Sequence, residues 1–322
     1  MSAKKLGWDN FFEAQLKTSD LSLIRARVSR QNTDNLVLLS EIGELSGVLP
    51  GKFRGKNKED LPTVGDWVLA RKLEHFEENR VLIVRVLTRR NVLVRTEIGQ
   101  EKRRQLMAAN VDRVFIVSGL DKEFNPKKIE RYLLLCWSLG LEPVIVLNKA
   151  DLIQKPESAL KKAGAIAGEV PILVLSALTG MGEKSFLSHF KAGSTNIFLG
   201  SSGVGKSSIS NMILGRENFL TGPVREKDSK GRHTTSHREL ILTDHNFVII
   251  DTPGIRGLQI LKENISLDAF QDILNLAKNC KFRDCAHISE PDCALKQAED
   301  EGLISSQRLS QFKVLSNLRS IP

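Results

Sequence analysis

Short apolar runs separated by polar turns fill the chain from Asp20 to Val94. The runs are LSLIRARVSR, NLVLLSEIG, GELSGVLPGKF, TVGDWVLARK and NRVLIVRVLTRRNVLVR, with turns near Gly43, Gly51 and Gly65. Five short strands bounded by turn residues are typical of a small antiparallel barrel. We therefore predict an oligonucleotide-binding (OB-fold) β-barrel in residues 20–98, after an N-terminal tail of residues 1–19.

From Val111 onward, apolar strands alternate with helical patterns. Strands are expected at residues 112–120, 142–151, 171–177, 195–200, 238–244 and 246–254, and helices at residues 126–140, at 156–167 and after Gly205. Alternation of this kind, with strands that are apolar almost throughout, indicates an α/β domain with a buried and largely parallel sheet. We place this domain at residues 99–267 and a helical, cysteine-bearing domain at residues 268–322.

A phosphate-binding loop is predicted between the strand at 195–200 and the helix that follows. Residues 200–207 match G-x-x-x-x-G-K-[ST] without exception. In this P-loop, backbone N–H groups surround the phosphates, the lysine reaches the β and γ oxygens, and the serine hydroxyl ligates Mg²⁺. The N-terminus of the next helix adds donors and a positive dipole end. The residues expected at the nucleotide are Gly200, Ser201, Ser202, Gly203, Val204, Gly205, Lys206, Ser207 and Ser208.

The sequence NKAD, residues 148–151, distinguishes GTP from ATP. It follows the apolar run VIVL, which places Asp151 at the end of a strand. A carboxylate there can accept hydrogen bonds from guanine N1–H and the exocyclic amine, a donor pair that adenine lacks. Asn148 either hydrogen-bonds the guanine edge or ties neighbouring loops together, and the Lys149 stem packs across the base. The remaining residues predicted near the base are Ala150, Ser176 and Ala177.

The run VIIDTPG supplies the residues expected at the γ-phosphate. Asp251 ends a strand and can hold Mg²⁺ through water, while the Gly254 amide can meet the γ-phosphate. Upstream, KDSKGRHTTSHREL contains the threonine that should ligate Mg²⁺; Thr234 is favoured slightly, and Thr235 stays open. The predicted magnesium ligands are therefore Ser207 and Thr234.

The residue that orients the attacking water is less obvious. In Ras-like enzymes a glutamine follows the switch glycine, and here that position is Ile255, whose side chain cannot orient water. His233, beside the threonines, is the nearest group able to accept a proton or a hydrogen bond. From the residues alone, an ordinary exposed loop histidine explains His233 equally well.

Three of the four cysteines lie close together near the C-terminus. Cys280, Cys285, His287 and Cys293 form C-x4-C-x-H-x5-C. Three thiolates and one imidazole suit a closed tetrahedral zinc site, with no position left for a catalytic water. We expect one structural zinc ion there.

Net charge and hydropathy bear on partners and location. The 322 residues include 47 Lys and Arg against 38 Asp and Glu, a net charge of +9. This excess favours a polyanionic partner such as nucleic acid. No apolar run reaches the roughly 18 residues needed to span a bilayer, and the N-terminus lacks the apolar segment of a signal peptide. A cytoplasmic, monomeric protein without a membrane partner is expected.

Taken together, NKAD at 148, SAL at 176, GSSGVGKSS at 200, GRHTT at 231, DTPG at 251 and the cysteine pattern resemble the RsgA (YjeQ/YloQ) family of circularly permuted GTPases. The resemblance covers nearly the whole chain. It implies a GTP hydrolase that binds the small ribosomal subunit late in its maturation, with hydrolysis stimulated by the subunit and coupled to release. It also implies that the barrel and zinc domain contact ribosomal RNA, and that His233 is the catalytic residue.

The order of the motifs is rotated relative to ordinary GTPases. There the phosphate loop comes first, whereas here NKAD and SAL precede it. Nucleotide binding requires only that loops converge at strand ends, so rotation leaves the chemistry intact. An alternative function, an RNA-binding module that uses GTP as a structural ligand without turnover, stays open because Ile255 replaces the glutamine.

Overall fold

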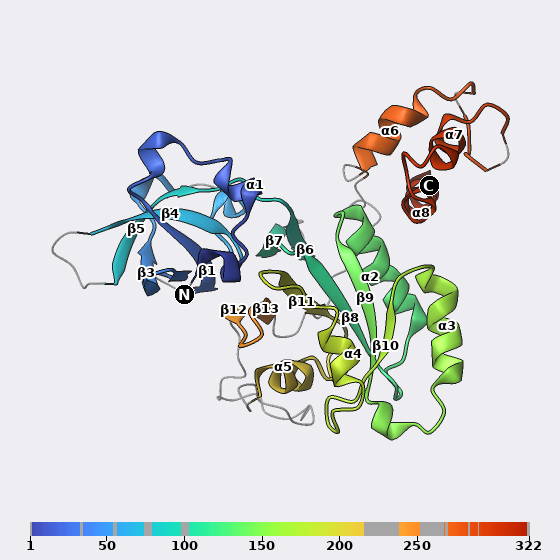
Figure 1. Ribbon diagram of the computed structural model, residues 1–322, viewed down its shortest axis with the longest axis horizontal. Coiled ribbons are helices and arrows are strands. Elements are labelled where there is room, and N and C mark those ends of the chain that lie inside the picture. Colours follow the sequence, from blue (N-terminus) through green and yellow to red (C-terminus); the bar gives the residue numbers. More distant parts are fainter. Residues whose placement is uncertain are drawn as a thin grey trace.

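The computed structural model describes residues 2–32, 35–53, 57–73, 79–97, 103–215, 238–251, 267, 270–282, 284–288 and 290–320. Figure 1 shows a β-barrel, an α/β domain and a smaller helical region that contains the C-terminus. The barrel and the α/β domain share one continuous sheet of eleven strands.

Five strands form the barrel: β1 (Ile24–Gln31), β2 (Leu36–Ser40), β3 (Gly43–Val48), β4 (Trp67–Lys72) and β5 (Arg80–Val86). Their order is β1-β2-β3-β5-β4, and pairing of β4 with β1 closes the barrel. Short 3-10 turns, η3 (Gly51–Phe53) and η4 (Lys58–Asp60), lie between β3 and β4. The predicted OB-type barrel is confirmed.

The fifth apolar run of the sequence, residues 79–95, divides into two strands that belong to different sheets. Its first half is β5, and its second half begins β6 (Val92–Glu97). Strand β6 pairs with β7 (Arg103–Ala109) in a separate two-stranded sheet. This hairpin leads from the barrel into the α/β domain.

The N-terminal segment packs on the barrel. It contains η1 (Ala3–Leu6), α1 (Asn10–Glu13) and η2 (Thr18–Asp20). Leu6, Trp8 and Phe12 are buried with Trp67 of β4, and the Trp8 and Trp67 rings meet edge to face with centroids 4.8 Å apart. Aromatic burial of this kind fixes the segment against the barrel wall.

The α/β domain has a parallel sheet with one antiparallel strand. Strands β8 (Arg113–Gly119), β9 (Glu142–Asn148), β10 (Ile172–Val174), β11 (Thr195–Leu199) and β13 (Val248–Asp251) are parallel in the order β10-β9-β8-β11-β13. Strand β12 (Glu239–Leu242) pairs antiparallel with β13. The predicted largely parallel sheet is confirmed.

Helices cover both faces of this sheet. Helices α2 (Pro126–Ser138) and α3 (Glu157–Ala167) pack on one face, where Val114 and Ile116 point, and α4 (Glu183–Leu187) and α5 (Lys206–Leu214) pack on the other, with Phe115 and Val117. Successive residues of a strand point to opposite faces, so both sets are apolar and the strand is apolar throughout. Because β8, β9, β10, β11 and β13 are parallel, their carboxyl ends meet at one edge of this three-layer domain.

The barrel and the α/β domain meet where Arg30 of β1 pairs with Glu239 of β12. Next to this pair, the Ser29 hydroxyl donates to the Leu240 carbonyl at 2.8 Å. Arg27, only 1% exposed, donates to the carbonyls of Leu6, Gly65 and Asn110, which come from the N-terminal segment, the barrel and the start of the α/β domain.

Burial lowers the pKa of Arg27 to about 10, so the side chain stays charged at neutral pH. A buried cation that donates to three carbonyls links these separate segments at the junction.

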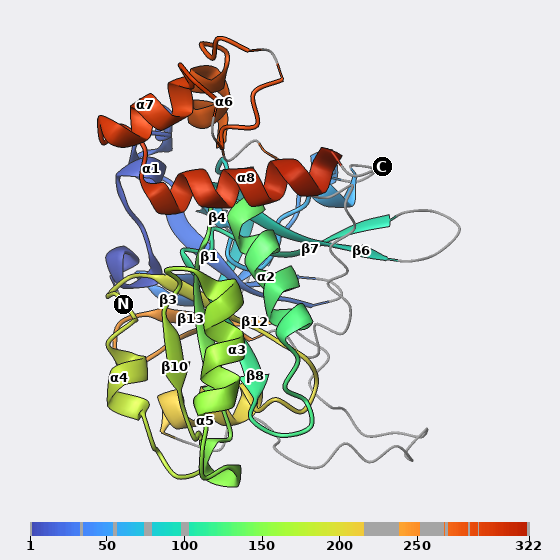
Figure 2. The ribbon, with the colours of Figure 1, turned by 90° about the vertical axis from the view of Figure 1, so that its right-hand side faces the viewer.

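The C-terminal region contains α6 (Gln271–Ala277), α7 (Ala294–Asp300) and α8 (Ser306–Ser320). Its core is one small cluster that includes Phe270, Leu295 and Phe312, and Leu134 of α2 joins it. Figure 2 shows α8 lying across the end of α2. Among the described residues, no helix combines the length and apolar character needed to cross a bilayer.

Candidate nucleotide site and metal centre

The predicted phosphate loop connects β11 to α5 at the carboxyl edge of the sheet. A Cβ on Gly200 would lie 2.3 Å from the Val117 carbonyl oxygen. At Gly205, where φ is +95°, a Cβ would lie 2.2 Å from Asn148 Nδ2. Only glycine fits at both positions, so the two motif glycines let the loop lie directly against the neighbouring strands.

Lys206 and Ser207 begin α5 behind the loop. The Lys206 ammonium donates to the carbonyls of Gly200 at 2.9 Å and Ser201 at 2.7 Å, so it lies within the curve of the loop. A cation beside the N-terminus of a helix creates positive potential where phosphate oxygens are expected. Ser202, Gly203, Val204 and Ser208 lie in the same loop and first helical turn.

Asn148 links three loops at the end of β9. Its side chain is 2% exposed. Nδ2 donates to the Val204 carbonyl at 2.9 Å, and Oδ1 accepts from the Ala177 amide at 3.1 Å. Of the two roles predicted for this residue, tying neighbouring loops together is the one with contacts in the structure.

Asp151 is held by the next strand. The Ser176 hydroxyl donates to Asp151 Oδ1 at 2.5 Å, and the Ala150 amide donates to the Leu175 carbonyl at 3.1 Å. The carboxylate therefore lies where the ends of β9 and β10 meet, beside the loop that contains Ala177. Asp151 of NKAD and Ser176 of SAL are 25 residues apart in the sequence but hydrogen-bonded to each other, so the two motifs form one cluster.

Two side chains outside the predicted set also contact the site. Asp121, just after β8, accepts from the Lys149 ammonium at 2.6 Å, and Lys128 at the start of α2 donates to the Ser201 hydroxyl at 3.0 Å. Sequence reasoning missed both. The available signal was their position, because polar residues after a buried parallel strand lie at the ligand-binding edge of the sheet.

The predicted γ-phosphate and catalytic residues are only partly described. Asp251 is the last residue of β13, which pairs with β11, so its carboxylate lies at the same edge as the phosphate loop. His233, Thr234, Thr235, Gly254 and Ile255 lie outside the described residues. Their roles stay predictions.

The predicted metal ligands come together between α6 and α7. One ligand atom from each of Cys280, Cys285, His287 and Cys293 lies within 4.8 Å of all the others. His287 Nδ1 lies 3.6 Å from the Cys280 sulfur and 3.5 Å from the Cys293 sulfur. Tetrahedral zinc, with bonds of about 2.3 Å to sulfur and about 2.0 Å to nitrogen, requires S···N separations of about 3.5 Å. Both of these S···N separations therefore match those of a tetrahedral zinc ion.

Local chemistry at this cluster favours the ligand forms of His287 and Cys293, whereas burial raises the pKa of the Cys285 thiol to about 11. Burial, and then the charge of Lys313, lower the pKa of His287, so the imidazole is neutral at neutral pH. Burial raises the pKa of Cys293, but backbone amides of the first turn of α7, together with hydrogen bonds from Cys285 and Cys280, bring the net value below the usual one. A neutral imidazole and a stabilised thiolate are the forms that bind metals.

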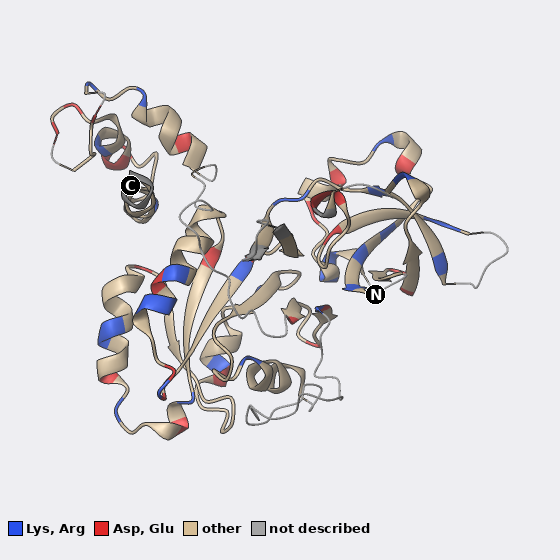
Figure 3. Ribbon diagram, turned by 180° about the vertical axis from the view of Figure 1, so that it is seen from behind, with Lys and Arg blue, Asp and Glu red and all other residues tan. Residues whose placement is uncertain are grey.

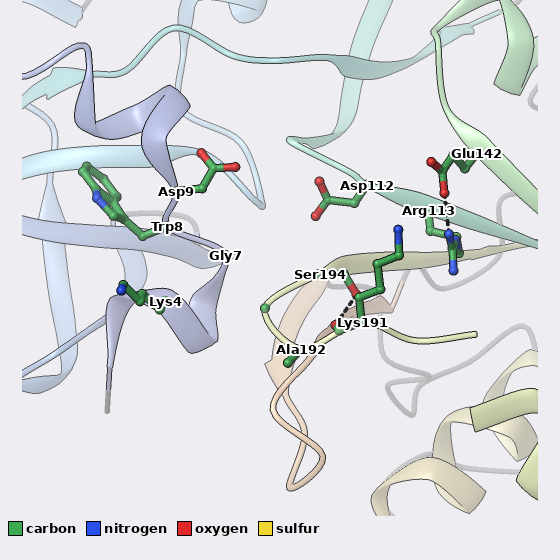
Figure 4. Close-up of a pocket in the computed structure, with 11 residues that line it drawn as sticks. Lys4, Gly7, Trp8, Asp9, Asp112, Arg113, Glu142, Lys191, Ala192 and Ser194 are labelled. Atoms are coloured by element: carbon green, nitrogen blue, oxygen red, sulfur yellow. Dashed lines mark hydrogen bonds and ion pairs between the residues drawn. The ribbon is translucent and has the colours of Figure 1, made fainter. Parts of the chain in front are cut away.

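A cavity of about 490 Å³ lies at the opposite edge of the sheet from these loops. Figure 4 shows it between the N-terminal segment, with Lys4 and Asp9, and the α/β domain, with Asp112 and Lys191. Arg90 pairs with both Asp9 and Asp112. No residue of the P-loop or of NKAD is among the described residues that line this cavity.

Basic residues are distributed over several elements. Figure 3 shows Lys and Arg on the barrel and on the helices of the α/β domain, interspersed with Asp and Glu. In and beside the barrel several arginines are paired with carboxylates, including Arg85 of β5 with Asp20 of η2 at 2.5 Å, and Arg89 with Asp66 at 2.8 Å. The five barrel strands hold seven Lys and Arg against one Glu, and carboxylates from other elements offset part of this charge.

Comparison with known proteins gives consistent results. The profile of the RsgA GTPase family matches residues 86–261. The chain is 36% identical to the small ribosomal subunit biogenesis GTPase RsgA of Opitutus terrae, over 98% of this chain and 89% of that protein. It is 38% identical to RsgA of Mesorhizobium japonicum, again over 98% and 89% of the two chains.

Solved structures show the same architecture. The crystal structure of YjeQ from Thermotoga maritima superposes with a TM-score of 0.61 at 28% identity, covering 93% of this chain and all of that one. The structure of YloQ, a circularly permuted GTPase, gives a TM-score of 0.57 at 22% identity and covers 95% and 99% of the two chains. With the rotated order of P-loop and NKAD and the converging loops, these similarities place the chain in the RsgA family of circularly permuted GTPases.

Proposed function

We propose that this chain is a GTPase that binds the small ribosomal subunit and assists its late maturation, with hydrolysis stimulated by the subunit and coupled to release. The observation that carries this proposal is the extent of similarity: relatives named small ribosomal subunit biogenesis GTPase align with 97–98% of the chain, so the barrel and the C-terminal region are included. We further propose that the protein is a monomer and acts in the cytoplasm.

At the base, Asp151 accepts hydrogen bonds from guanine while Asn148 holds the loops in register. Support comes from the contacts of both side chains with the loop at 176–177. Adenine has no matching pair of donors for a carboxylate, so this cluster selects guanine nucleotides.

At the phosphates, the P-loop amides and Lys206 bind the β and γ oxygens. Ser207 and Thr234 would hold magnesium, with Asp251 assisting through water, and magnesium would neutralise charge on the phosphates. Gly254 contributes an amide to the γ-phosphate. The position of Asp251 beside the phosphate loop supports this part of the assignment.

His233 orients the attacking water and accepts its hydrogen bond. Ile255 has no polar group for this purpose, and His233 stands beside the switch threonine in the sequence.

The cysteine cluster binds one structural zinc ion through four protein ligands. Such a site stabilises the fold of the region at 268–322 and takes no part in hydrolysis. We assign ribosomal RNA contacts to this region and to the barrel at 20–98, which flank the GTPase domain at 99–267.

The test is GTP hydrolysis at multiple turnover, with and without purified small ribosomal subunits. Subunits are expected to raise the hydrolysis rate. His233→Ala is expected to lower the stimulated rate by roughly 100-fold or more, the effect of losing a group that assists proton transfer. Its affinity for GDP should be retained. Release of no phosphate even with subunits would instead support a module that uses GTP as a structural ligand. Large subunits serve as the matched control.

A further inference from the structure

We propose that Asp121 is a positioning residue of the nucleotide site, which holds the Lys149 side chain where it covers the guanine base. The inference rests on the proposed function, because it adds a residue to the same site. Asp121 lies outside the P-loop, NKAD and every other motif of the site.

The contact is short and both partners are partly withdrawn from water. Lys149 Nζ lies 2.6 Å from Asp121 Oδ2, and the two side chains are 27% and 20% exposed. The other carboxylate oxygen, Oδ1, accepts from the Glu123 amide at 3.0 Å. Because one oxygen is fixed by the backbone, the second is presented to the lysine in a defined direction.

The sheet brings these residues together. Strands β8 and β9 are parallel, with Gly119 opposite Asn148, and the Leu120 amide donates to the Asn148 carbonyl at 2.7 Å. Asp121 and Lys149 directly follow this contact on their two strands. A Cβ on residue 119 would lie 2.6 Å from Asp121 Oδ1, so Gly119 leaves the room that the carboxylate occupies.

Charge favours the pair. Partial burial raises the pKa of Asp121, but the hydrogen bond from Lys149 and other favourable contacts bring it below its usual value, so the group is ionised at neutral pH. A long side chain loses rotamer freedom when a ligand orders it. An ion pair that restrains Lys149 beforehand reduces this loss and strengthens binding.

A double-mutant cycle tests the inference. Kd values for GDP and GTP are measured by titration for the unmodified chain, Asp121→Ala, Lys149→Ala and the double variant. Asp121→Ala is expected to weaken both nucleotides by about fivefold, the upper range for a partly exposed ion pair. In the Lys149→Ala background the same change should have no further effect. The kcat of Asp121→Ala at saturating GTP should equal that of the unmodified chain, because the base is remote from the reacting phosphate.

Asp272→Ala is the matched control, because Asp272 also accepts from a basic side chain, Arg308, at 2.7 Å but lies in the C-terminal region. It is expected to leave both Kd values unchanged. Unchanged affinity in Asp121→Ala, or an equal loss in the Lys149→Ala background, would overturn the positioning role. A chain that binds no guanine nucleotide overturns the proposed function itself, and a melting curve identifies a variant that has lost its fold.

Discussion

The nucleotide site and the metal cluster are both built from loops, yet their side chains are held by different means. At the nucleotide site, Asn148, Lys149 and Asp151 each bond to a residue at least 25 positions away in sequence. These loops lie on a sheet with an extensive core on both faces. The four metal-ligating candidates, in contrast, all fall between Cys280 and Cys293, over one small core.

This difference explains why the order of motifs can be rotated in one region. A site assembled from strand ends depends on which strands are neighbours, so the chain can visit them in another order. A site assembled from fourteen consecutive positions depends on the local chain and on the ion that its donors share. Loss of the metal or of one of its ligands should therefore act on the C-terminal region alone. Loss of one contact at the nucleotide site should instead act on several loops at once.

The largest expected effect is that of metal removal. Chelation, or Cys285→Ser, should cost several kcal/mol of folding free energy in the C-terminal region, because binding energy at a structural zinc site is folding energy. Hydrogen exchange should show lost protection in α6, α7 and α8 while GDP affinity is retained.

Cys136→Ala is the matched control for that variant. Cys136 is a buried cysteine of α2 outside the cluster, and burial raises its thiol pKa, so it should not affect metal content. Lost protection in β8 and β9 as well would show that the two regions do not fold independently.

A smaller effect is expected from Asn148→Ala. This change removes two buried hydrogen bonds between loops, which should weaken GDP and GTP binding by about 2 kcal/mol, or about 30-fold. Titration with both nucleotides measures the loss. Asn91→Ala is the control, since Asn91 bonds in the same bidentate way to the Val111 backbone, away from the site. If Asn91→Ala weakened nucleotide binding equally, the effect of Asn148 would be one of general stability.

The smallest effect concerns the ion pair between Asp272 of α6 and Arg308 of α8. Its side chains are 51% and 35% exposed, so Asp272→Asn should cost only about 0.5 kcal/mol. The hydrogen bond from Arg308 lowers the pKa of Asp272, so the stabilisation is present above the unfolded-state pKa and is lost as pH falls through the folded-state pKa.

Urea unfolding of the unmodified chain and of Asp272→Asn, each at pH 7 and at pH 3, measures this contribution as the difference between their free energies of unfolding. The difference should shrink at pH 3. A difference of several kcal/mol at pH 7 would show that side-chain pairing, and not only the metal, stabilises the C-terminal region.

Much of the fold follows from local pattern. Barrel strands, the alternating strands and helices of the α/β domain and the C-terminal helix were predictable, because period and turn residues are local properties. The division of residues 79–95 into β5 and β6 was not. Residues 88–91 are polar but include no glycine or proline, and only the pairing of β6 with β7 places the two strands in different sheets.

By itself, the sequence determined the residue types and spacings of the P-loop, of NKAD and of the four candidate metal donors, on which their predicted chemistry depends. Tertiary structure decided which side chains meet: Asp121 with Lys149, Asn148 with two loops, and Arg27 with three segments. Those contacts depend on strand neighbours and register in an eleven-stranded sheet. Pairing across long sequence separations is set by the packing of the whole domain, so no local pattern specifies it.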